Sequence, residues 1–343
     1  MGWFVLKYFD DSEDKLSEYY IIGIDGGATR SHGVLYDEQG RTLAHAPAQG
    51  TSLTVYPKIA QKRIINMITQ MTKEAGIPTD NIDALGIAVA GASDEDGRDI
   101  MFGELDCLGL SRRSLIASDT EAALEVNWPS MPGILVSVGT GMMCLARSAD
   151  GKYHRTGGLG HQAGDVGSGY WLGRNLLMHL ALNDLNLYGD QELMELGGII
   201  LETLEGDDLT DLIEEVMEDS DQVRRIASLA APICQSAEQG NEIALALVQE
   251  ASQGVADTIL ELLYNLGYSE KILTLAGNGG VIRNDLYRKL LNEALRFDYP
   301  DLRWLFSDVS PAYGAGILAG RLMDIEVDLR EIVKQGAIAP TDR

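Results

Sequence analysis

A short glycine-rich turn between two apolar segments contains the first residues that could do chemistry. The sequence Asp25-Gly26-Gly27-Ala28-Thr29 follows an apolar run, Tyr20 to Ile24, and precedes another, His32 to Tyr36. Because glycines carry no Cβ atom, backbone N–H groups here can approach a ligand closely, and such groups suit a phosphate. Thr29 adds a hydroxyl donor, and the carboxylate of Asp25 could hold a magnesium ion through water.

The turn matches neither of two familiar phosphate-binding patterns. No Gly-Lys-Ser/Thr follows the glycines, as a Walker loop requires, and no GxGxxG opens a helix. An ordinary hairpin with a Gly-Gly turn is therefore the alternative interpretation, and the rest of the chain must decide between the two.

The same design recurs about one domain further along the chain. Residues 133–147 again read as a strand, a turn and a strand, with Gly139-Thr140-Gly141 at the turn. Asp150-Gly151 closes this hairpin much as Asp37 to Gly40 closes the first. Two copies of one hairpin design suggest a duplicated α/β domain, and a chance resemblance is the alternative.

A loop dense in glycine follows the second hairpin. Six glycines lie between Gly157 and Gly169, ends included, and the loop leads into a predicted helix. Amides and one carboxylate, that of Asp165, converging at a helix start could hold a small polar ligand. A flexible connector is the alternative, but three apolar residues interleave with the glycines and favour an ordered loop: Leu159, Val166 and Trp171.

The remaining segments supply strands and helices around these loops. Apolar residues at helical spacing predict an amphipathic helix from Ile59 to Ala75, which ends at Gly76. Asn284 is expected to cap a later helix. Further strands are predicted at 41–46, 83–89, 114–117, 272–276 and 304–306, and further helices at 98–108, 121–126, 170–185, 285–297 and 311–323, with mostly helix over 191–267.

Size and composition limit the function classes. A chain of 343 residues predicts two domains, and a formal charge of −25 argues against binding to nucleic acid or an anionic membrane. No run is long and apolar enough to span a bilayer. The three scattered cysteines, Cys107, Cys144 and Cys234, show no CxxC spacing and predict reduced thiols in a cytoplasmic protein. Residues 1–17 read as an N-terminal extension.

With these pieces in order, the chain resembles the N-acetylglucosamine kinase and BadF-type ATPase family of the acetate and sugar kinase, heat-shock chaperone and actin superfamily. The match covers roughly residues 20–324. The Asp25 turn looks like the family's first phosphate motif, with Ala28 in place of a usual third glycine, and the Thr140 turn looks like the second. Gly277-Asn278-Gly279-Gly280 looks like the nucleoside motif. Gly158-Leu159-Gly160-His161 and Gly164-Asp165-Val166-Gly167-Ser168 resemble the sugar-binding loop.

The resemblance implies an α/β fold of two ribonuclease-H-like domains with ATP and a sugar in the cleft between them. The first domain would comprise residues 18–120, completed by a helix at 311–324, and the second residues 121–310 with a helical insertion. A homodimer is possible, as in some relatives.

The resemblance also assigns roles to residues. Asp25 would organise Mg²⁺, Thr29 and Thr140 would contact phosphates, and Asp119 would be the catalytic base. Asp119 lies between a predicted strand and a predicted helix, where a carboxylate can take the proton of an attacking hydroxyl. It could also cap the helix, and the two roles do not exclude each other. The glycines expected at ATP are Gly26, Gly27, Gly139, Gly141, Gly277, Gly279 and Gly280, and the residues expected at the sugar are Ser52, Gly158, Leu159, Gly160 and Asp165.

Three departures from the family pattern leave the sugar open. Leu159 replaces a common Trp, Val166 a common Glu, and Ser52 an Asn that often binds sugar. The leading hypothesis is ATP-dependent phosphorylation of an amino sugar, most directly N-acetylglucosamine at its 6-hydroxyl, with glucosamine or a muramic-acid-type sugar as alternatives. Rival hypotheses are an ATPase that activates a redox partner enzyme and a sugar-sensing protein that has lost catalysis.

Overall fold

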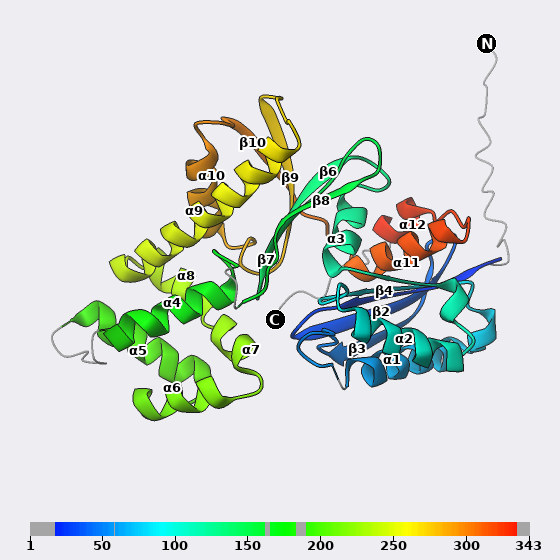
Figure 1. Cartoon of the computed structure of the whole chain (residues 1–343), viewed down its shortest axis with the longest axis horizontal. Helices are drawn as coiled ribbons and strands as arrows, with labels where there is room; N and C mark the ends of the chain where they lie inside the picture. Colours follow the sequence, from blue (N-terminus) through cyan, green and yellow to red (C-terminus); the bar gives the residue numbers. More distant parts are fainter. Residues whose placement is uncertain (1–17, 58, 162–164, 183–189, 335–343) are drawn as a thin grey trace, which may run out of the picture.

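The computed structural model describes residues 18–57, 59–161, 165–182 and 190–334. Two five-stranded sheets, each covered by helices, form two lobes (Figure 1). The extension predicted at residues 1–17 lies outside the described residues. Both lobes mix helices and strands, so the predicted α/β class with two ribonuclease-H-like domains is confirmed.

The first sheet has the order β3-β2-β1-β4-β5. Strands β1 to β3 form an antiparallel meander, and β4 and β5 run parallel to β1. Apolar side chains of α1 and α2 cover one face of the sheet, and those of α11 cover the other. The elements are β1 (Tyr20–Gly26), β2 (Arg30–Asp37), β3 (Thr42–Gln49), α1 (Ala60–Ala75), β4 (Ala84–Val89), α2 (Glu95–Cys107), β5 (Ser114–Ala117) and α11 (Pro311–Leu322), with 3₁₀ turns at Thr79–Asn81 and Ser111–Arg113.

The second sheet repeats this arrangement with the order β10-β9-β6-β7-β8. In each lobe the strands lie in the order third, second, first, fourth, fifth. The second strand runs antiparallel to the first and to the third, and the fourth and fifth run parallel to the first. The shared order confirms the duplicated domain expected from the two hairpins. The strands are β6 (Gly133–Val138), β7 (Met142–Arg147), β8 (Tyr153–Gly157), β9 (Ile272–Asn278) and β10 (Asp301–Leu305).

The second lobe carries the helical insertion between β8 and β9. Its apolar side chains join those of the second sheet in the largest buried cluster of the described residues. Asn284 caps α10 as predicted, since its side-chain oxygen accepts a hydrogen bond from the Tyr287 amide at 2.8 Å. The helices are α4 (Gly169–Leu182), α5 (Gln191–Leu204), α6 (Leu209–Glu218), α7 (Gln222–Ala227), α8 (Ala230–Glu238), α9 (Glu242–Asn265) and α10 (Asp285–Leu295).

Two elements escaped the sequence analysis. Strand β8 lies at the sheet edge and pairs only with β7, so its residues, Tyr-His-Arg-Thr-Gly, need no apolar alternation. Helix α12 (Leu329–Lys334) has six residues, too few for a helical period to emerge, although Ile332 is buried against the first lobe.

Helix α3 (Asp119–Asn127) lies between the lobes and packs against α11 and against strands of both sheets (Figure 1). Ser118 is its N-cap, and Ser118 and Glu121 form a reciprocal capping box. The alternative role of Asp119 as the helix cap is therefore wrong. The predicted domain boundary at residue 120 falls inside this shared helix, and the division into residues 18–120 and 121–310 stays a prediction.

The small residues of α11 let it lie directly on the first sheet. A Cβ atom at Gly23 would overlap the carbonyl oxygen of Ala312, and one at Gly86 would overlap that of Ala315. Helix backbone therefore contacts strand backbone with no side chain between them. Any larger residue at Gly23 must push α11 away from β1.

We expect Gly23→Ala to lower the free energy of unfolding by about 2–3 kcal/mol, because the added methyl group overpacks this contact. Urea denaturation measures the change. Gly103→Ala on α2 is the matched control, since nothing lies within 4 Å of a Cβ there. The control should gain roughly 0.5–1 kcal/mol from helix propensity, and equal effects of the two substitutions would contradict the packing argument.

Candidate active site

Asp25 lies at the end of β1, one residue before the strand gives way to the glycine turn. It faces His32 of β2 and Ala88 of β4 in the strand register, and its side chain is only partly exposed. Burial raises the pKa of Asp25 to about 7, and repulsion from the Asp119 carboxylate adds to the shift. Two carboxyl groups from different elements therefore share one site.

Asp119 is the first residue of α3 and enters the site from the helix between the lobes. Its Oδ1 accepts a hydrogen bond from the Thr120 amide at 2.9 Å. Burial raises the pKa of Asp119, while the backbone amides at the helix start oppose the shift. A carboxylate with a raised pKa beside a second carboxylate is a candidate general base.

The carboxylate pair fits a magnesium ion that is shared with a ligand. Mg²⁺ commonly takes one or two protein carboxylates together with water and phosphate oxygens. A cation would also relieve the repulsion that raises the pKa of Asp25. Among the described residues no group of three or more acidic, histidine or cysteine side chains could hold a metal ion. Water and phosphate oxygens would complete the coordination.

The first predicted phosphate turn is held by its own hydrogen bonds and by residues 50–51. The Gly27 amide donates to the Arg30 carbonyl at 3.1 Å, and the Thr51 amide donates to the Gly27 carbonyl at 3.1 Å. Within the described backbone, no carbonyl accepts from the amides of Ala28 and Thr29. These two amides, and the exposed Thr29 side chain, are the groups of the turn that can meet a ligand. Gly26 instead packs closely on Thr51.

The second predicted phosphate turn docks on the start of α4. The amides of Gly169 and Tyr170 donate to the carbonyls of Gly139 and Thr140, at 2.7 and 3.2 Å. Gly141 lies beside the carboxylate of Asp165. The structure thus joins this turn to the end of the glycine-dense loop, as expected for motifs that serve one ligand.

Part of the predicted nucleoside motif meets the same turn. Gly279 has φ +99°, and a Cβ atom there would lie 2.9 Å from the Gly139 nitrogen, so only glycine fits. Gly280 is exposed beside it. Gly277 differs, because its missing side chain leaves room for the Phe306 ring. The first glycine of the motif is explained by packing inside the second lobe.

Asp165 organises the predicted sugar loop. Its Oδ1 accepts a hydrogen bond from the Gly160 amide at 3.2 Å, and the residue has a φ of +38°. Burial raises the pKa of Asp165, and the amides of the loop oppose this shift. Gly158 donates to the Met142 carbonyl at 2.9 Å, which ties the loop to β7. Leu159 is 71% exposed, and Gly164 lies outside the described residues.

Ser52 is the predicted sugar residue with the least accessible side chain. It is only 2% exposed, and its hydroxyl oxygen accepts a hydrogen bond from the Val55 amide at 3.2 Å. Its role toward a sugar stays a prediction.

His32 is a neighbour of the site that the sequence analysis missed. Its position opposite Asp25 could have been found by counting back from the tight turn of the hairpin. His32 Nδ1 lies 3.0 Å from the hydroxyl of Ser310, the N-cap of α11. Burial lowers the pKa of His32 to about 4, and the stacked ring of His45 contributes. The hydrogen bond between neutral His32 and Ser310 connects β2, the strand beside Asp25, to α11.

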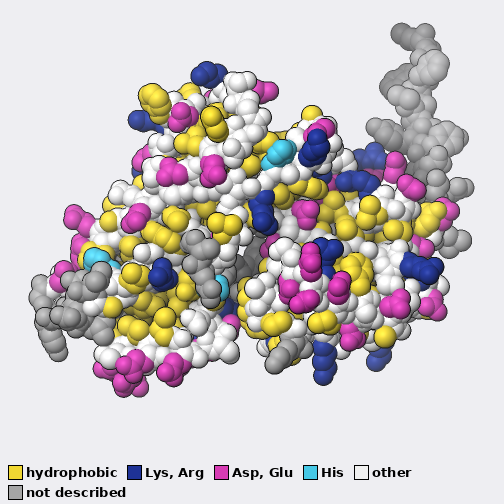
Figure 2. Space-filling model, in the orientation of Figure 1, with side chains coloured by type: hydrophobic (Ala, Val, Ile, Leu, Met, Phe, Trp, Pro, Cys, Tyr) yellow, Lys and Arg dark blue, Asp and Glu magenta, His cyan; other side chains and the backbone are white. Residues whose placement is uncertain are grey.

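The two predicted phosphate turns lie at the ends of their sheets that point toward the middle of the molecule (Figure 1). A furrow separates the two lobes on the face shown in Figure 2. The lobes also contact each other directly: the Tyr56 hydroxyl of the first lobe donates to Asp221 Oδ1 of the second at 3.2 Å. A ligand held by both turns would therefore lie between lobes that already touch.

Two lobes with one sheet order and paired carboxylates between them define a two-domain ribonuclease-H-like protein, of the class to which actin-like ATPases and sugar kinases belong. The chain belongs to the BadF/BadG/BcrA/BcrD ATPase family, whose sequence model matches residues 22–319. The resemblance inferred from the motifs is thereby confirmed.

Named relatives cover almost the whole chain. An N-acetylmuramic acid/N-acetylglucosamine kinase of Clostridium acetobutylicum is 28% identical over 88% of this chain and 98% of its own length. An N-acetyl-D-glucosamine kinase of Dictyostelium discoideum is 27% identical over 89% and 98%. A crystal structure from Chromobacterium violaceum with a provisional N-acetylglucosamine kinase name matches with a TM-score of 0.69 at 24% identity, over 88% of this chain and 99% of that one. It supports the fold.

The raised pKa of Asp25 predicts a pH-dependent stability in the absence of divalent metal. Because the folded pKa of about 7 exceeds the ordinary 3.8, the folded protein binds the extra proton and loses stability as the pH rises between these values. Asp25→Asn should therefore be more stable than the wild type at pH 8, by on the order of 2 kcal/mol, with little difference at pH 4.

Urea denaturation in EDTA at both pH values measures this difference. Asp150→Asn is the control, because hydrogen bonds from Lys152 and Ser148 lower the pKa of this exposed carboxyl to about 2. Removing the Asp150 carboxylate should therefore not stabilise the protein at either pH. A stability gain for Asp25→Asn that does not depend on pH would contradict the burial of a repelled carboxylate.

Proposed function

We propose that the protein is an ATP-dependent kinase that phosphorylates N-acetylglucosamine, or a closely related amino sugar, at its primary hydroxyl. The names of two relatives that span nearly the whole chain support the substrate class. The observation that carries the proposal is the pair of partly buried carboxyl groups, Asp25 and Asp119, brought together from β1 and α3.

In the proposed reaction Asp119 accepts the proton of the sugar hydroxyl. The hydroxyl oxygen forms a bond to the γ-phosphorus, and the bond between that phosphorus and the β,γ-bridging oxygen of ATP breaks, which leaves ADP. A base is most effective when its pKa approaches the working pH, and burial shifts the pKa of Asp119 upward in that direction.

The phosphates are assigned to the two turns. The amides of Ala28 and Thr29, with the hydroxyls of Thr29 and Thr140, would stabilise charge on the transferring group. Asp25 would hold Mg²⁺, which supplies positive charge to the phosphate oxygens. Gly279 and Gly280 would admit the nucleoside, and closure of the lobes would exclude water so that ATP is not simply hydrolysed.

The sugar is assigned to the loop organised by Asp165. Gly158, Gly160 and Asp165 would bind its hydroxyls, with Ser52 opposite. Leu159 and Val166 are both exposed, so apolar surface replaces groups that could hydrogen-bond a polar substituent. Without such groups the loop would discriminate weakly between polar substituents on the sugar, which keeps a muramic-acid-type sugar and glucosamine as alternative substrates. A cytoplasmic location and a homodimer stay predictions.

A coupled assay of ADP release across a sugar panel tests the proposal. With N-acetylglucosamine, N-acetylmuramic acid, glucosamine and glucose, we expect release to depend on sugar and to be fastest with an N-acetylated amino sugar. ADP release that no sugar stimulates would contradict the proposal and favour an ATPase that serves a partner protein.

Asp119→Asn should lower sugar phosphorylation by about 10²–10⁴-fold, because the amide cannot accept the proton. Binding of a fluorescent ATP analogue should persist. Glu121→Gln, two residues along the same helix, is the matched control, since glutamine can replace glutamate in a capping box. Near wild-type turnover of Asp119→Asn would remove Asp119 from the role of base.

A further inference from the structure

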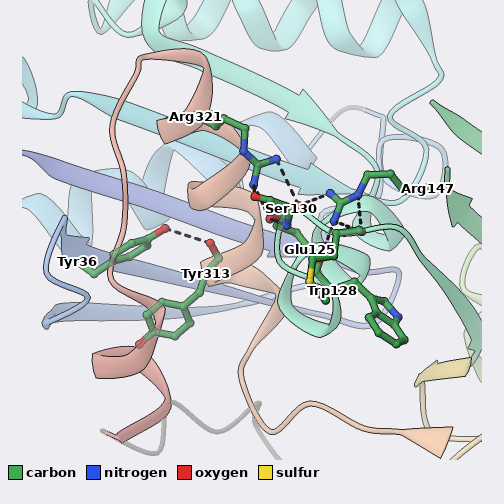
Figure 3. Close-up of polar contacts among 8 residues, drawn as sticks. Tyr36, Glu125, Trp128, Ser130, Arg147, Tyr313 and Arg321 are labelled. Carbon is green, nitrogen blue, oxygen red and sulfur yellow. Dashed lines mark hydrogen bonds and ion pairs between the residues drawn. The ribbon is translucent and has the colours of Figure 1, made fainter. Parts of the chain in front are cut away.

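An ion triad around a buried carboxylate joins the lobes near the end of α3 that lies away from Asp119. The Glu125 side chain is fully buried, and its carboxylate accepts hydrogen bonds from Arg147 Nη1 and from Arg321 Nη2, both at 2.5 Å (Figure 3). Arg147 ends β7 of the second sheet, and Arg321 lies in the last turn of α11, which covers the first sheet. One carboxylate thus receives a guanidinium group from each lobe.

The same two arginines hold the end of α3. Arg147 donates to the carbonyl of Met131 through Nε at 3.0 Å and also to the carbonyl of Trp128, the C-cap of the helix. Arg321 donates to the Ser130 hydroxyl at 2.7 Å, and the Ser130 amide donates to Glu125 at 3.0 Å. Cations favour the carbonyl end of a helix, so the C-terminal end of α3 is fixed in place by charge and by hydrogen bonds.

Helix α11, which carries Arg321, is held firmly between the first sheet and α3. The Tyr36 hydroxyl of β2 donates to the Tyr313 carbonyl of α11 at 3.0 Å (Figure 3). Gly314 of α11 lies so close to α3 that a Cβ atom would overlap the Ala122 carbonyl. Helix α11 therefore holds α3 in a fixed position relative to the first sheet.

The elements joined by the triad carry the proposed catalytic groups at their other ends. Helix α3 begins with Asp119, and its nine residues span about 13 Å. Strand β7 begins directly after the turn at Gly139 to Gly141. A small rotation about the triad would consequently move Asp119 relative to this turn.

We propose that Glu125 is a positioning residue: through Arg147 and Arg321 it sets the angle between the lobes and so holds Asp119 in register with the second phosphate turn. Removing one member of a buried ion pair leaves the charge of its partner without an opposite charge. The three side chains therefore favour one fixed arrangement. The catalytic part of this inference rests on the proposed kinase function, whereas the part that concerns the lobe angle does not.

The lobe angle can be tested without any substrate. Cys107 on α2 is exposed, Cys144 and Cys234 are buried, and Tyr264 at the end of α9 is 86% exposed. Spin labels at Cys107 and at Tyr264→Cys therefore report one distance between the lobes. We expect Glu125→Gln to broaden or shift the distribution of this distance relative to the wild-type background.

The matched control is Arg225→Met. Arg225 also binds two carboxylates and a carbonyl, those of Glu215, Asp219 and Leu204, but all of them belong to the second lobe. Its loss should leave the distance unchanged. Identical distributions for wild type and Glu125→Gln would overturn the proposal whether or not the protein is a kinase.

Turnover tests the catalytic part. Glu125→Gln should lower kcat for the sugar by about tenfold or more, since a displacement near 1 Å can cost that much, with KM values within about twofold. The yield of sugar phosphate per ADP should also fall, and this ratio does not depend on the folded fraction. Arg225→Met should retain the wild-type ratio.

Arg321→Met provides a second variant should Glu125→Gln not fold, because Arg321 is 44% exposed and its loss leaves the Glu125–Arg147 pair intact. It should show a smaller change in the same direction. An unchanged kcat and an unchanged ratio in both variants would overturn the positioning role. If the wild-type protein phosphorylates no sugar, the proposed function fails and the label distances alone decide whether Glu125 sets the lobe angle.

Discussion

The site depends on keeping two carboxyl groups close together in a partly buried position. Asp25 and Asp119 repel each other, and burial disfavours the charged form of both. Such a pair persists only where the surrounding structure determines its place. Strand β1 fixes Asp25 through neighbours on both sides, and α3 fixes Asp119 through the capping box at its start. The stability of the scaffold therefore sustains an arrangement that is unfavourable until a cation or a proton arrives.

The duplicated sheets explain how a single chain surrounds this pair. Each lobe presents a turn between its first two strands, and Figure 1 shows both turns directed toward the middle of the molecule. The close contact of α11 with β1 and β4 leaves no room for side chains, and the same helix packs on α3. The position of Asp119 relative to Asp25 thus follows from backbone contacts. Its position relative to the second turn depends on charged groups that meet at Glu125.

Local patterns in the sequence were sufficient for most of the fold. The two hairpins, the helix ending at Gly76 and the cap at Asn284 are each specified by neighbouring residues, and all are present in the structure. Strand β8 was missed because an edge strand can be polar on both faces. The role of Gly277 was not foreseeable, since the Phe306 ring that occupies its space follows β10, 29 positions further along the chain. Likewise, the Glu125 triad joins residues up to 196 positions apart, and no local spacing predicts such a contact.

The central claim is that both turns and both carboxylates serve one nucleotide and one acceptor. A crystal structure with Mg²⁺, a non-hydrolysable ATP analogue and N-acetylglucosamine tests this most directly. The account predicts phosphates between residues 26–29 and 139–141, the metal ion beside Asp25, and the primary hydroxyl of the sugar within hydrogen-bonding distance of Asp119. A nucleotide bound away from either turn, or an Asp119 carboxylate directed away from the sugar, would contradict it.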